Sequence, residues 1–242
     1  MYFFRTTLGP VAVAFTDRRD GVSRAPFDSL NLAIGGDDDP AARAENLRRV
    51  LDDFAPGARL ADLHQVHGGA VVVADGATGA GRPEADGIVT GRRDLVLAVR
   101  AADCVPVLLA DPAGGHVGAA HCGRPGLAAG VVPRTVAAMR DRGAGDLTAW
   151  IGPHVCGGCY EVPAEMQDDV AARVPEARAT TTWGTPSLDL GAGVRAQLEA
   201  AGVTVHDVSR CTRESADLYS YRRDGARSGR LAGLVVLGDA VR

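Results

Sequence analysis

Residues 94–111 read DLVLAVRAADCVPVLLAD and contain two apolar runs separated by a short polar turn. The runs, residues 96–102 and 105–110, lack the alternation of polar and apolar residues that marks a sheet with one face in water. Strands that are covered on both faces carry continuous apolar runs of this kind. The stretch therefore predicts two buried strands, with Cys104 between them at the edge of an apolar run.

The segments around this stretch predict further strands and helices. Pro40 opens one predicted helix, and Gly202 closes another. The predicted strands are residues 11–16, 70–74, 85–90, 115–123, 147–153, 203–209 and 231–238, and the predicted helices are residues 40–55, 126–143, 162–174 and 187–202. The chain has 242 residues and neither an internal repeat nor a linker, so we expect a single domain of mixed α and β structure over residues 1–242.

The composition excludes several classes of protein. The formal net charge of −4 gives no sign of a polyanion-binding surface, so we expect no nucleic-acid partner. All basic residues are arginines, and the absence of lysine excludes a Schiff base, a pyridoxal-phosphate site and a P-loop. Any bound phosphate must therefore be held by arginine side chains or by backbone N–H groups.

Cysteine usage and hydropathy bear on where the protein works. The five cysteines are odd in number and widely spaced, which is atypical of a disulfide framework and indicates a reduced, cytoplasmic setting. The first residues lack a basic leader followed by a long apolar core, so we expect no signal peptide. No stretch approaches the roughly 20 uninterrupted apolar residues of a membrane span, so we expect no membrane partner.

Three short passages place a histidine or cysteine at the edge of an apolar run. They are HQVHGGAVVV around His67, AADCVPVLLAD around Cys104 and GHVGAAHCG around His121. Two imidazoles and a thiolate suit a zinc ion, and three protein ligands would leave a fourth position for water or substrate. An open position is typical of a catalytic site. The sequence therefore predicts catalytic and metal-binding roles for these three residues.

Other interpretations of these residues stay open. Cys104 and His121 could instead form a metal-free nucleophilic pair, as in a cysteine hydrolase. Taken singly, His67 is typical of a loop histidine and Cys104 of a small buried apolar residue. Cys122 follows His121 directly, and neighbouring residues on an extended chain point to opposite faces. We therefore do not expect Cys122 to share a metal with His121.

Two further patterns carry weaker signals. Cys156 and Cys159 form a Cys-x-x-Cys pair, but a structural zinc site requires a second ligand pair, and none with suitable spacing is evident. We interpret this pair as part of a loop. The acidic residues 37–39 lie just before the helix that begins at residue 40, a position that favours capping of the helix N-terminus over a calcium or magnesium site.

Two polar segments are candidates for substrate binding. The segment YSYRRDGARSGR, residues 219–230, alternates tyrosines with polar residues as on a strand. Its arginines Arg222, Arg223 and Arg230 could hold phosphate or a nucleoside, or could lie on a solvated hairpin. Residues 17–40 form a long loop rich in Gly, Pro, Asp and Ser, and long loops inside compact domains are often functional.

These passages together resemble one family, the laccase-domain, YfiH-like proteins. The resembling segments follow the family's order: FTDRRDGVSRAPFDSLNLAIGGDDDP, QVHGGAVV, ADGIVT, AADCVPVLLAD, GAAHCGRPGLAAGVV, IGPHVCGGCYEV and YSYRRDGARSGR. Members of the family, once described as multicopper polyphenol oxidases, are now described as purine nucleoside phosphorylases. The resemblance spans nearly the whole chain. It implies a layered α/β/β/α sandwich, related to the Cys–His deamidase domain of cytotoxic necrotizing factor toxins.

The resemblance also implies a reaction. It implies zinc held by His67, Cys104 and His121, the residues that the ligand argument selects. It implies phosphorolysis of adenosine, guanosine, inosine and methylthioadenosine to the base and the pentose 1-phosphate, with adenosine deamination as a further activity. Purine nucleosides and inorganic phosphate are thus the expected partners. Copper and polyphenol oxidation are the alternative, but a multicopper cluster uses several His-x-His pairs and the chain has none.

For phosphorolysis the protein must position phosphate and stabilise charge on the departing base. The predicted phosphate ligands are Arg18, Arg222 and Arg223, and the residues predicted to bind the sugar or base are Ser29, Asn31 and Gln65.

The chain departs from the family pattern in two places. Arg124-Pro125 stands where the family often has Trp-Arg, and Leu47 stands after Asn46 where the family often has arginine. Both departures leave the three ligands intact, so the reaction class implied by the resemblance is kept.

Overall fold

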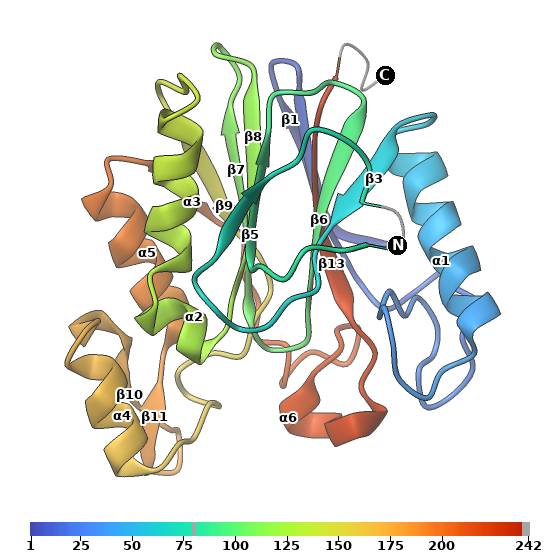
Figure 1. The fold of residues 1–242 in the computed structure, drawn as a ribbon. Helices are drawn as coiled ribbons and strands as arrows, with labels where there is room; N and C mark the ends of the chain where they lie inside the picture. Colours follow the sequence, from blue (N-terminus) through green and yellow to red (C-terminus); the bar gives the residue numbers. More distant parts are fainter. Residues whose placement is uncertain (79–80, 239–242) are drawn as a thin grey trace.

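A computed structural model describes residues 1–78 and 81–238 as two β-sheets packed face to face, with helices on both outer faces (Figure 1). The expected α/β/β/α sandwich of mixed α and β structure is confirmed. Helices α3 and α5 cover one sheet, and α1 covers the other.

The sandwich consists of one five-stranded and one six-stranded sheet. The five-stranded sheet has the order β1-β2-β13-β6-β3, with bounds Tyr2–Leu8, Val11–Thr16, Leu231–Leu237, Leu95–Ala101 and Arg59–Asp62. The six-stranded sheet has the order β12-β9-β7-β8-β5-β4, with bounds Thr204–Asp207, Thr148–Ile151, Val105–Asp111, His116–Cys122, Gly87–Thr90 and Val71–Val73. The pairs β3–β6, β4–β5 and β9–β12 are parallel, and the other neighbours are antiparallel.

The helices flank the two sheets, and a small hairpin extends from them. The helices are α1 Pro40–Phe54, α2 Arg124–Ala128, α3 Val131–Arg140, α4 Ala164–Ala171, α5 Leu190–Ala200 and α6 Tyr221–Asp224, with 3-10 turns at Pro175–Ala177 and Gly225–Arg227. The hairpin pairs β10 Arg178–Thr180 with β11 Pro186–Leu188. Among the described residues, no helix combines the length and the hydropathy needed to cross a bilayer.

The two strands predicted from residues 94–111 are buried on both faces, because each belongs to a sheet that has helices on one face and the other sheet on its opposite face. In β6, Leu95, Leu97 and Val99 face the other sheet, whereas Val96 and Ala98 pack toward α1. The side chains of β7 divide in the same way between the helices and the opposite sheet. This double burial explains the unbroken apolar runs.

The turn between these two strands joins the two sheets. Strand β6 belongs to the five-stranded sheet and β7 to the six-stranded sheet. Residues 102–104 therefore carry the chain across one end of the sandwich. Asp103 has a left-handed backbone with φ of 89°, and Cys104 comes directly before β7. The crossing thus fixes where the Cys104 thiol lies.

Helix α1 begins as the sequence predicts and anchors the long loop before it. Asp39 caps the helix by accepting the N–H of Ala41, which confirms the capping interpretation of the acidic triplet. Asn46, fully buried on the inner face, accepts the Val22 N–H. Its amide donates to the Ser23 hydroxyl and to the carbonyls of Ser29 and Asn31. One amide side chain thereby holds residues 22–31 against the helix.

Two local predictions are wrong, and the edge strands β1 and β3 were not predicted. The helix expected over residues 126–143 is divided into α2 and α3 at Gly130, whose φ of 72° interrupts the helical hydrogen bonds. The segment with Tyr219 and Tyr221 is not a strand: Ser220 caps the short helix α6, and the alternation of tyrosines arises because one is buried and the other exposed. Strand β1 escaped prediction because its side chains are only partly buried.

Candidate active site

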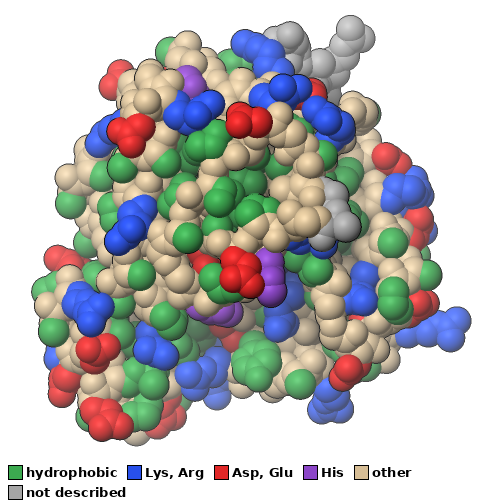
Figure 2. Space-filling view, viewed as in Figure 1, with side chains coloured by type: hydrophobic (Ala, Val, Ile, Leu, Met, Phe, Trp, Pro, Cys, Tyr) green, Lys and Arg blue, Asp and Glu red, His purple; other side chains and the backbone are tan. Residues whose placement is uncertain are grey.

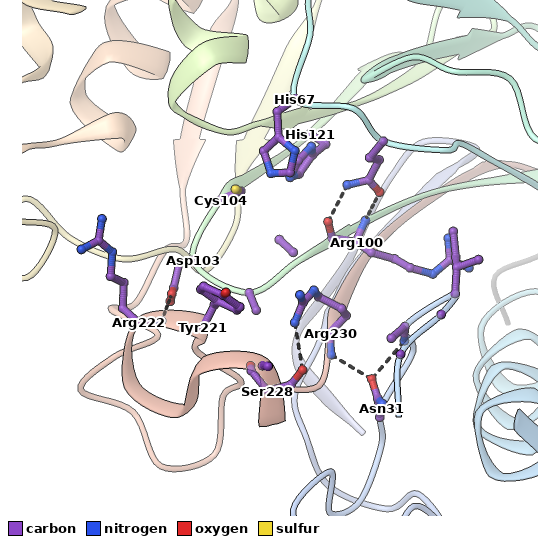
Figure 3. A pocket seen from close by; sticks show the side chains of 18 of the residues that line it. Asn31, His67, Arg100, Asp103, Cys104, His121, Tyr221, Arg222, Ser228 and Arg230 are labelled. Carbon is purple, nitrogen blue, oxygen red and sulfur yellow. Dashed lines mark hydrogen bonds between the residues drawn. The ribbon is translucent and has the colours of Figure 1, made fainter. Parts of the chain in front are cut away.

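His67, Cys104 and His121 come together at one end of the sandwich (Figure 3). His67 lies in the loop between β3 and β4, Cys104 lies in the turn between β6 and β7, and His121 lies near the end of β8. One ligand atom from each residue lies within 4.8 Å of those of the other two. The imidazole rings of the two histidines meet edge to face, with centroids 4.8 Å apart. The three residues selected from the sequence therefore share one site.

The backbone around the cluster is adapted to close packing. His67 has a left-handed backbone with φ of 60°, an uncommon conformation outside glycine. Gly123, which begins the turn from β8 into α2, lies directly against the cluster. A Cβ atom at this position would lie 2.7 Å from Cδ2 of His67 and 3.1 Å from Sγ of Cys104. Glycine is required here because only its backbone leaves room for both side chains.

The carboxylate of Asp86 orients both histidines. It is fully buried, just before β5. Its Oδ1 lies 2.8 Å from Nδ1 of His121 and accepts the backbone N–H of His67, while its Oδ2 accepts the N–H groups of Val66 and Gly68. An ionised carboxylate only accepts, so Nδ1 of His121 carries the proton and Nε2 is available to the site.

Asp86 was not among the predicted site residues. It lies in the segment ADGIVT, which was predicted only to form a strand. A signal was present, since an aspartate next to a buried strand needs a partner for its charge. The sequence alone does not say which histidine provides it.

The electrostatics of the cluster favour a thiolate beside an imidazolium. Burial opposes ionisation of Cys104, but the charge on His121 and hydrogen bonds from both histidines outweigh it and lower the pKa of the thiol to about 6. Burial also opposes protonation of His121, but the Cys104 thiolate and Asp86 outweigh it and raise the pKa of the imidazole to about 9. Without a metal, the charged pair is therefore the stable form between these two pH values.

The donor set fits a zinc ion on the chemistry of its atoms. A thiolate and two imidazole nitrogens are ligands that zinc accepts, and three of them leave a fourth position open. The buried carboxylate behind His121 is the usual partner of a metal-binding histidine. Cys122, the neighbouring cysteine, is fully buried in the core between β8 and the helices. Burial raises the pKa of its thiol well above the ordinary value, so it is not suited to join the site.

The cluster lines a cavity of about 900 Å³, large enough for a nucleoside and a phosphate. In the space-filling view, histidine and acidic side chains border a hollow on this face, and arginine side chains lie below it (Figure 2). The polar residues lining the cavity include Asn31, Gln65, Arg100, Asp103, Tyr221, Arg222, Ser228 and Arg230. A metal-type cluster and arginine side chains therefore share one cavity.

Arg230 is the cation best placed in this cavity (Figure 3). Its Nη1 donates to the carbonyls of Ser228 and Gly229, which orients the guanidinium. Among the described residues, its Nε and Nη2 have no protein acceptor, so these N–H groups are available to a ligand. The guanidinium also lies 5.8 Å from the centre of the exposed Tyr221 ring. Arg230 can therefore bind an anion at little cost in side-chain ordering.

The other predicted phosphate ligands lie differently. Arg222 lines the cavity, but its guanidinium stacks on Tyr160 at 4.5 Å. Arg223 does not line the cavity: its guanidinium donates to four backbone carbonyls of residues 212–218 and to Asp224. Arg18 also lies outside the cavity lining, where it pairs with Asp28 and stacks on a tyrosine.

The residues predicted to bind sugar or base are engaged within the protein. Asn31 lines the cavity, but its amide donates to Asp38 and its carbonyl accepts the backbone N–H of Arg230. Gln65 lines the cavity and pairs with both backbone groups of Arg100. Ser29 lies outside the lining, where its hydroxyl donates to a carbonyl of the long loop. By accepting the backbone N–H of Arg230, the side chain of Asn31 positions Arg230.

Comparison with known proteins assigns the chain to a family. The family model described as multi-copper polyphenol oxidoreductase laccase matches residues 12–238. The chain belongs to this family. The matched region includes all three residues of the cluster, His67, Cys104 and His121.

Relatives of known name and structure support the assignment to the family. The chain is 52% identical to "Purine nucleoside phosphorylase ORF3" of Streptomyces griseus over 235 residues, 95% of each chain. It is 51% identical to a Streptomyces coelicolor protein also named purine nucleoside phosphorylase, covering 96% of this chain and 98% of the relative. The crystal structure of Geobacillus stearothermophilus YlmD superposes with a TM-score of 0.89 at 30% identity, covering 99% of this chain and 97% of YlmD.

Replacing Gly123 by alanine should weaken zinc binding on the order of tenfold to 100-fold, because the new methyl group displaces His67 or Cys104 from the cluster. Zinc affinity is measured by competition with a chromophoric chelator. Gly68→Ala is the matched control, since a Cβ atom there meets nothing closer than 3.6 Å and should leave the affinity unchanged. Equal affinities for wild type and Gly123→Ala would contradict this geometry of the site.

In metal-free protein, alkylation of Cys104 by iodoacetamide should reach half its maximal rate near pH 6, because the thiolate forms as the pH rises through the lowered pKa. An ordinary cysteine would reach this point near pH 8.5. The rate is followed by mass spectrometry of the peptide that contains Cys104. Zinc should protect the thiol, and the buried Cys122 should stay unmodified throughout. A half-maximal rate near pH 8.5 would show that His121 does not stabilise the thiolate.

Proposed function

We propose that the chain is a zinc-dependent purine nucleoside phosphorylase that acts on adenosine, guanosine, inosine and methylthioadenosine. The observation that carries the proposal is a two-histidine, one-cysteine cluster that shares a cavity with an arginine open to anions. The names of the Streptomyces relatives, at 52% and 51% identity over nearly the full length, support the same reaction. The free thiols of all five cysteines suit a reducing cytoplasm, where we place the enzyme.

In phosphorolysis, a phosphate oxygen attacks C1′ of the ribose as the bond from C1′ to the purine nitrogen breaks. The products are the pentose 1-phosphate and the base, which takes up one proton. Positive charge develops on the sugar and negative charge on the leaving base. The protein therefore has to hold the phosphate dianion beside C1′ and favour charge separation in a site shielded from water.

We assign the phosphate to Arg230. Its free N–H groups supply charge-assisted hydrogen bonds of the kind that arginine makes with phosphate oxygens. The exposed ring of Tyr221, beside this guanidinium, offers a flat apolar surface for the nucleoside. Arg222 lines the same cavity, and its backbone N–H is fixed by Asp103. The segment 221–230, which lies across the cavity from Cys104, thus supplies the side of the cavity that binds the substrate.

His67, Cys104 and His121 would hold the zinc ion, which when bound supplies a Lewis acid that polarises a substrate oxygen or activates water. Asp86 keeps the proton on Nδ1 of His121, so that Nε2 faces the cluster as a neutral donor. Each carboxylate oxygen of Asp103 accepts a hydrogen bond within the protein, one from the Thr212 hydroxyl and one from the Arg222 N–H, so we do not assign it as the base. We place it as a positioning residue for the turn that carries Cys104.

Adenosine deamination is part of the proposal as a second reaction of the same site. It replaces the exocyclic amine of adenine by water oxygen and releases ammonia. The three-ligand donor set, which leaves a position for water, is the feature that supports it. Release of inosine and ammonia from adenosine without phosphate distinguishes this reaction from phosphorolysis.

A metal-free hydrolase is the second candidate function. In this arrangement Cys104 would be the nucleophile, His121 the base, and Asp86 the carboxylate that orients the histidine. Copper-dependent polyphenol oxidation finds less support. The candidate metal sites of the described chain contain only two of its six histidines, too few for a multicopper cluster.

Cys104→Ala should abolish phosphate-dependent release of hypoxanthine from inosine, because the variant loses one metal ligand. Base release is measured with and without phosphate, and with and without a chelator. Cys122→Ala, which alters the neighbouring core cysteine, should retain most of the activity. Activity that requires Cys104 but survives complete removal of metal would replace the proposal by the metal-free hydrolase.

Arg230→Met should lower kcat/KM for phosphate on the order of tenfold to 100-fold, which corresponds to losing charged hydrogen bonds of about 1.5–3 kcal/mol. Methionine keeps much of the length of the side chain but removes its charge and donors. Initial rates are measured over a range of phosphate concentrations. Arg222→Met should have a smaller effect, since that guanidinium is stacked on Tyr160. A larger effect at Arg222 would reverse the assignment.

A further inference from the structure

A second cluster of potential ligands lies outside the three-residue site. It consists of Cys156, Cys159, Cys211 and Glu214, and one ligand atom of each lies within 4.8 Å of those of the others. The Cys-x-x-Cys pair is evident in the sequence, but its partner pair is not, because it lies about 50 residues further along the chain. Cys211 and Glu214 have the same two-residue spacing, in the segment Cys-Thr-Arg-Glu, and the fold brings them to the first pair.

The backbone holds these two pairs side by side. In the first turn, the N–H groups of Cys159 and Tyr160 both donate to the carbonyl of Cys156, so the two thiols point to the same side. The second turn lies against the strand-like segment before the first, because the Thr212 N–H donates to the His154 carbonyl at 3.0 Å. Four donors thus converge from two turns that are far apart in the sequence.

Glycines allow this approach. A Cβ atom on Gly157 would lie 2.8 Å from Cβ of Asp189, at the start of α5. A Cβ atom on Gly158 would lie 3.2 Å from Cγ2 of Thr182 and 3.8 Å from Sγ of Cys156. The Cys-Gly-Gly-Cys turn is therefore packed tightly against its surroundings, which limits the movement of its two sulfurs.

The separations agree with a common tetrahedral ion. With zinc bonds of about 2.3 Å to sulfur and about 2.0 Å to oxygen, a tetrahedron places a sulfur and an oxygen ligand about 3.5 Å apart. Sγ of Cys159 and Oε1 of Glu214 are 3.4 Å apart. The other pairs lie within 4.8 Å, so a contraction of at most about 1 Å brings two sulfurs to the distance of about 3.8 Å expected from the same geometry.

We propose that Cys156, Cys159, Cys211 and Glu214 form a second, structural zinc site. Four protein ligands close the coordination sphere, which is typical of a structural ion and contrasts with the three-residue site. Three thiols and a carboxylate suit zinc better than magnesium or calcium, which prefer oxygen ligands alone. A disulfide would use two of the sulfurs and leave the third and the carboxylate without a common partner.

The proposed site would brace the active cavity. Thr212, directly after Cys211, donates its hydroxyl to Asp103, which precedes Cys104. Arg223 collects the carbonyls of residues 212, 213, 215 and 218, so the second turn is joined to the segment that carries Tyr221 and Arg222. A fixed second turn therefore steadies both the Cys104 turn and the substrate side of the cavity, without any of its ligands facing the substrate.

Metal content tests the proposal directly. After removal of adventitious metal and reconstitution with a small excess of zinc, the full chain should retain two zinc ions by elemental mass spectrometry. Cys104→Ala should retain one, the double variant Cys156→Ser/Cys211→Ser should retain one, and the combination should retain none. Cys122→Ala is the matched control for loss of a buried cysteine and should retain two. A double variant with the same zinc content as wild type would overturn the proposal.

Two further measurements keep the test valid if the double variant folds poorly. Glu214→Gln changes only an exposed side chain, and it should speed transfer of one of the two zinc ions to a chelator on the order of tenfold or more. In the Cys104→Ala background, cobalt should give the charge-transfer absorption of a thiolate site, since three thiols remain to bind it. Absence of this band, or an intact mass two hydrogens below the reduced chain, would instead indicate a disulfide.

The outcome is independent of the proposed activity. A chain that holds two zinc ions but releases no base would contradict the phosphorylase and leave the second site intact. A chain that releases base with one zinc ion, lost in Cys104→Ala, would contradict the second site alone. In wild type, loss of the second ion should also lower the thermal midpoint, because metal binding to the folded chain contributes directly to stability.

Discussion

A single buried carboxylate, that of Asp86, sets the geometry on which the candidate active site depends. It accepts three consecutive backbone N–H groups, from residues 66–68, and pairs with the ring of His121. A buried carboxylate without such partners would cost several kcal/mol. The same hydrogen bonds explain why His67 adopts its left-handed backbone, because this conformation turns successive N–H groups toward one anion. The side chain of Asp86, just before β5, is therefore hydrogen-bonded to both the loop at residues 66–68 and strand β8.

This arrangement works because the cluster lies where the two sheets meet. The turn from β6 to β7 leaves one sheet and enters the other, so the position of Cys104 is determined by the packing of both. His121 belongs to β8, the hydrogen-bonded neighbour of β7. The sandwich core between the sheets is continuous and apolar, from Phe15 to Trp150. The three side chains of the cluster therefore project from a rigid frame, which suits a functional site that must hold its geometry to about 0.5 Å.

The sequence predicted those parts of the molecule that depend on local pattern. The apolar runs on either side of Cys104 gave both buried strands, and the proline and aspartate before residue 41 gave the start of α1. The cluster was predictable because cysteine and histidine carry a chemical signature of their own. The role of Asp86 was not predictable, because aspartates serve many roles in proteins and only the fold shows its four hydrogen-bond partners. The strand predicted at Tyr219 failed because alternating burial also arises where a short helix follows a buried residue.

The arginines show why residue type alone could not assign the anion site. Arg223 and Arg230 lie in the same segment and look alike in sequence, yet one guanidinium is used by backbone carbonyls and an aspartate while the other keeps N–H groups for the cavity. The difference follows from the turn at residues 212–218, whose carbonyls point inward and require a planar donor with five N–H groups. Arg230 donates to backbone carbonyls only through Nη1, so its remaining N–H groups are not used by the turn. Two arginines within eight positions of the chain therefore differ in whether their guanidinium groups keep N–H groups for the cavity.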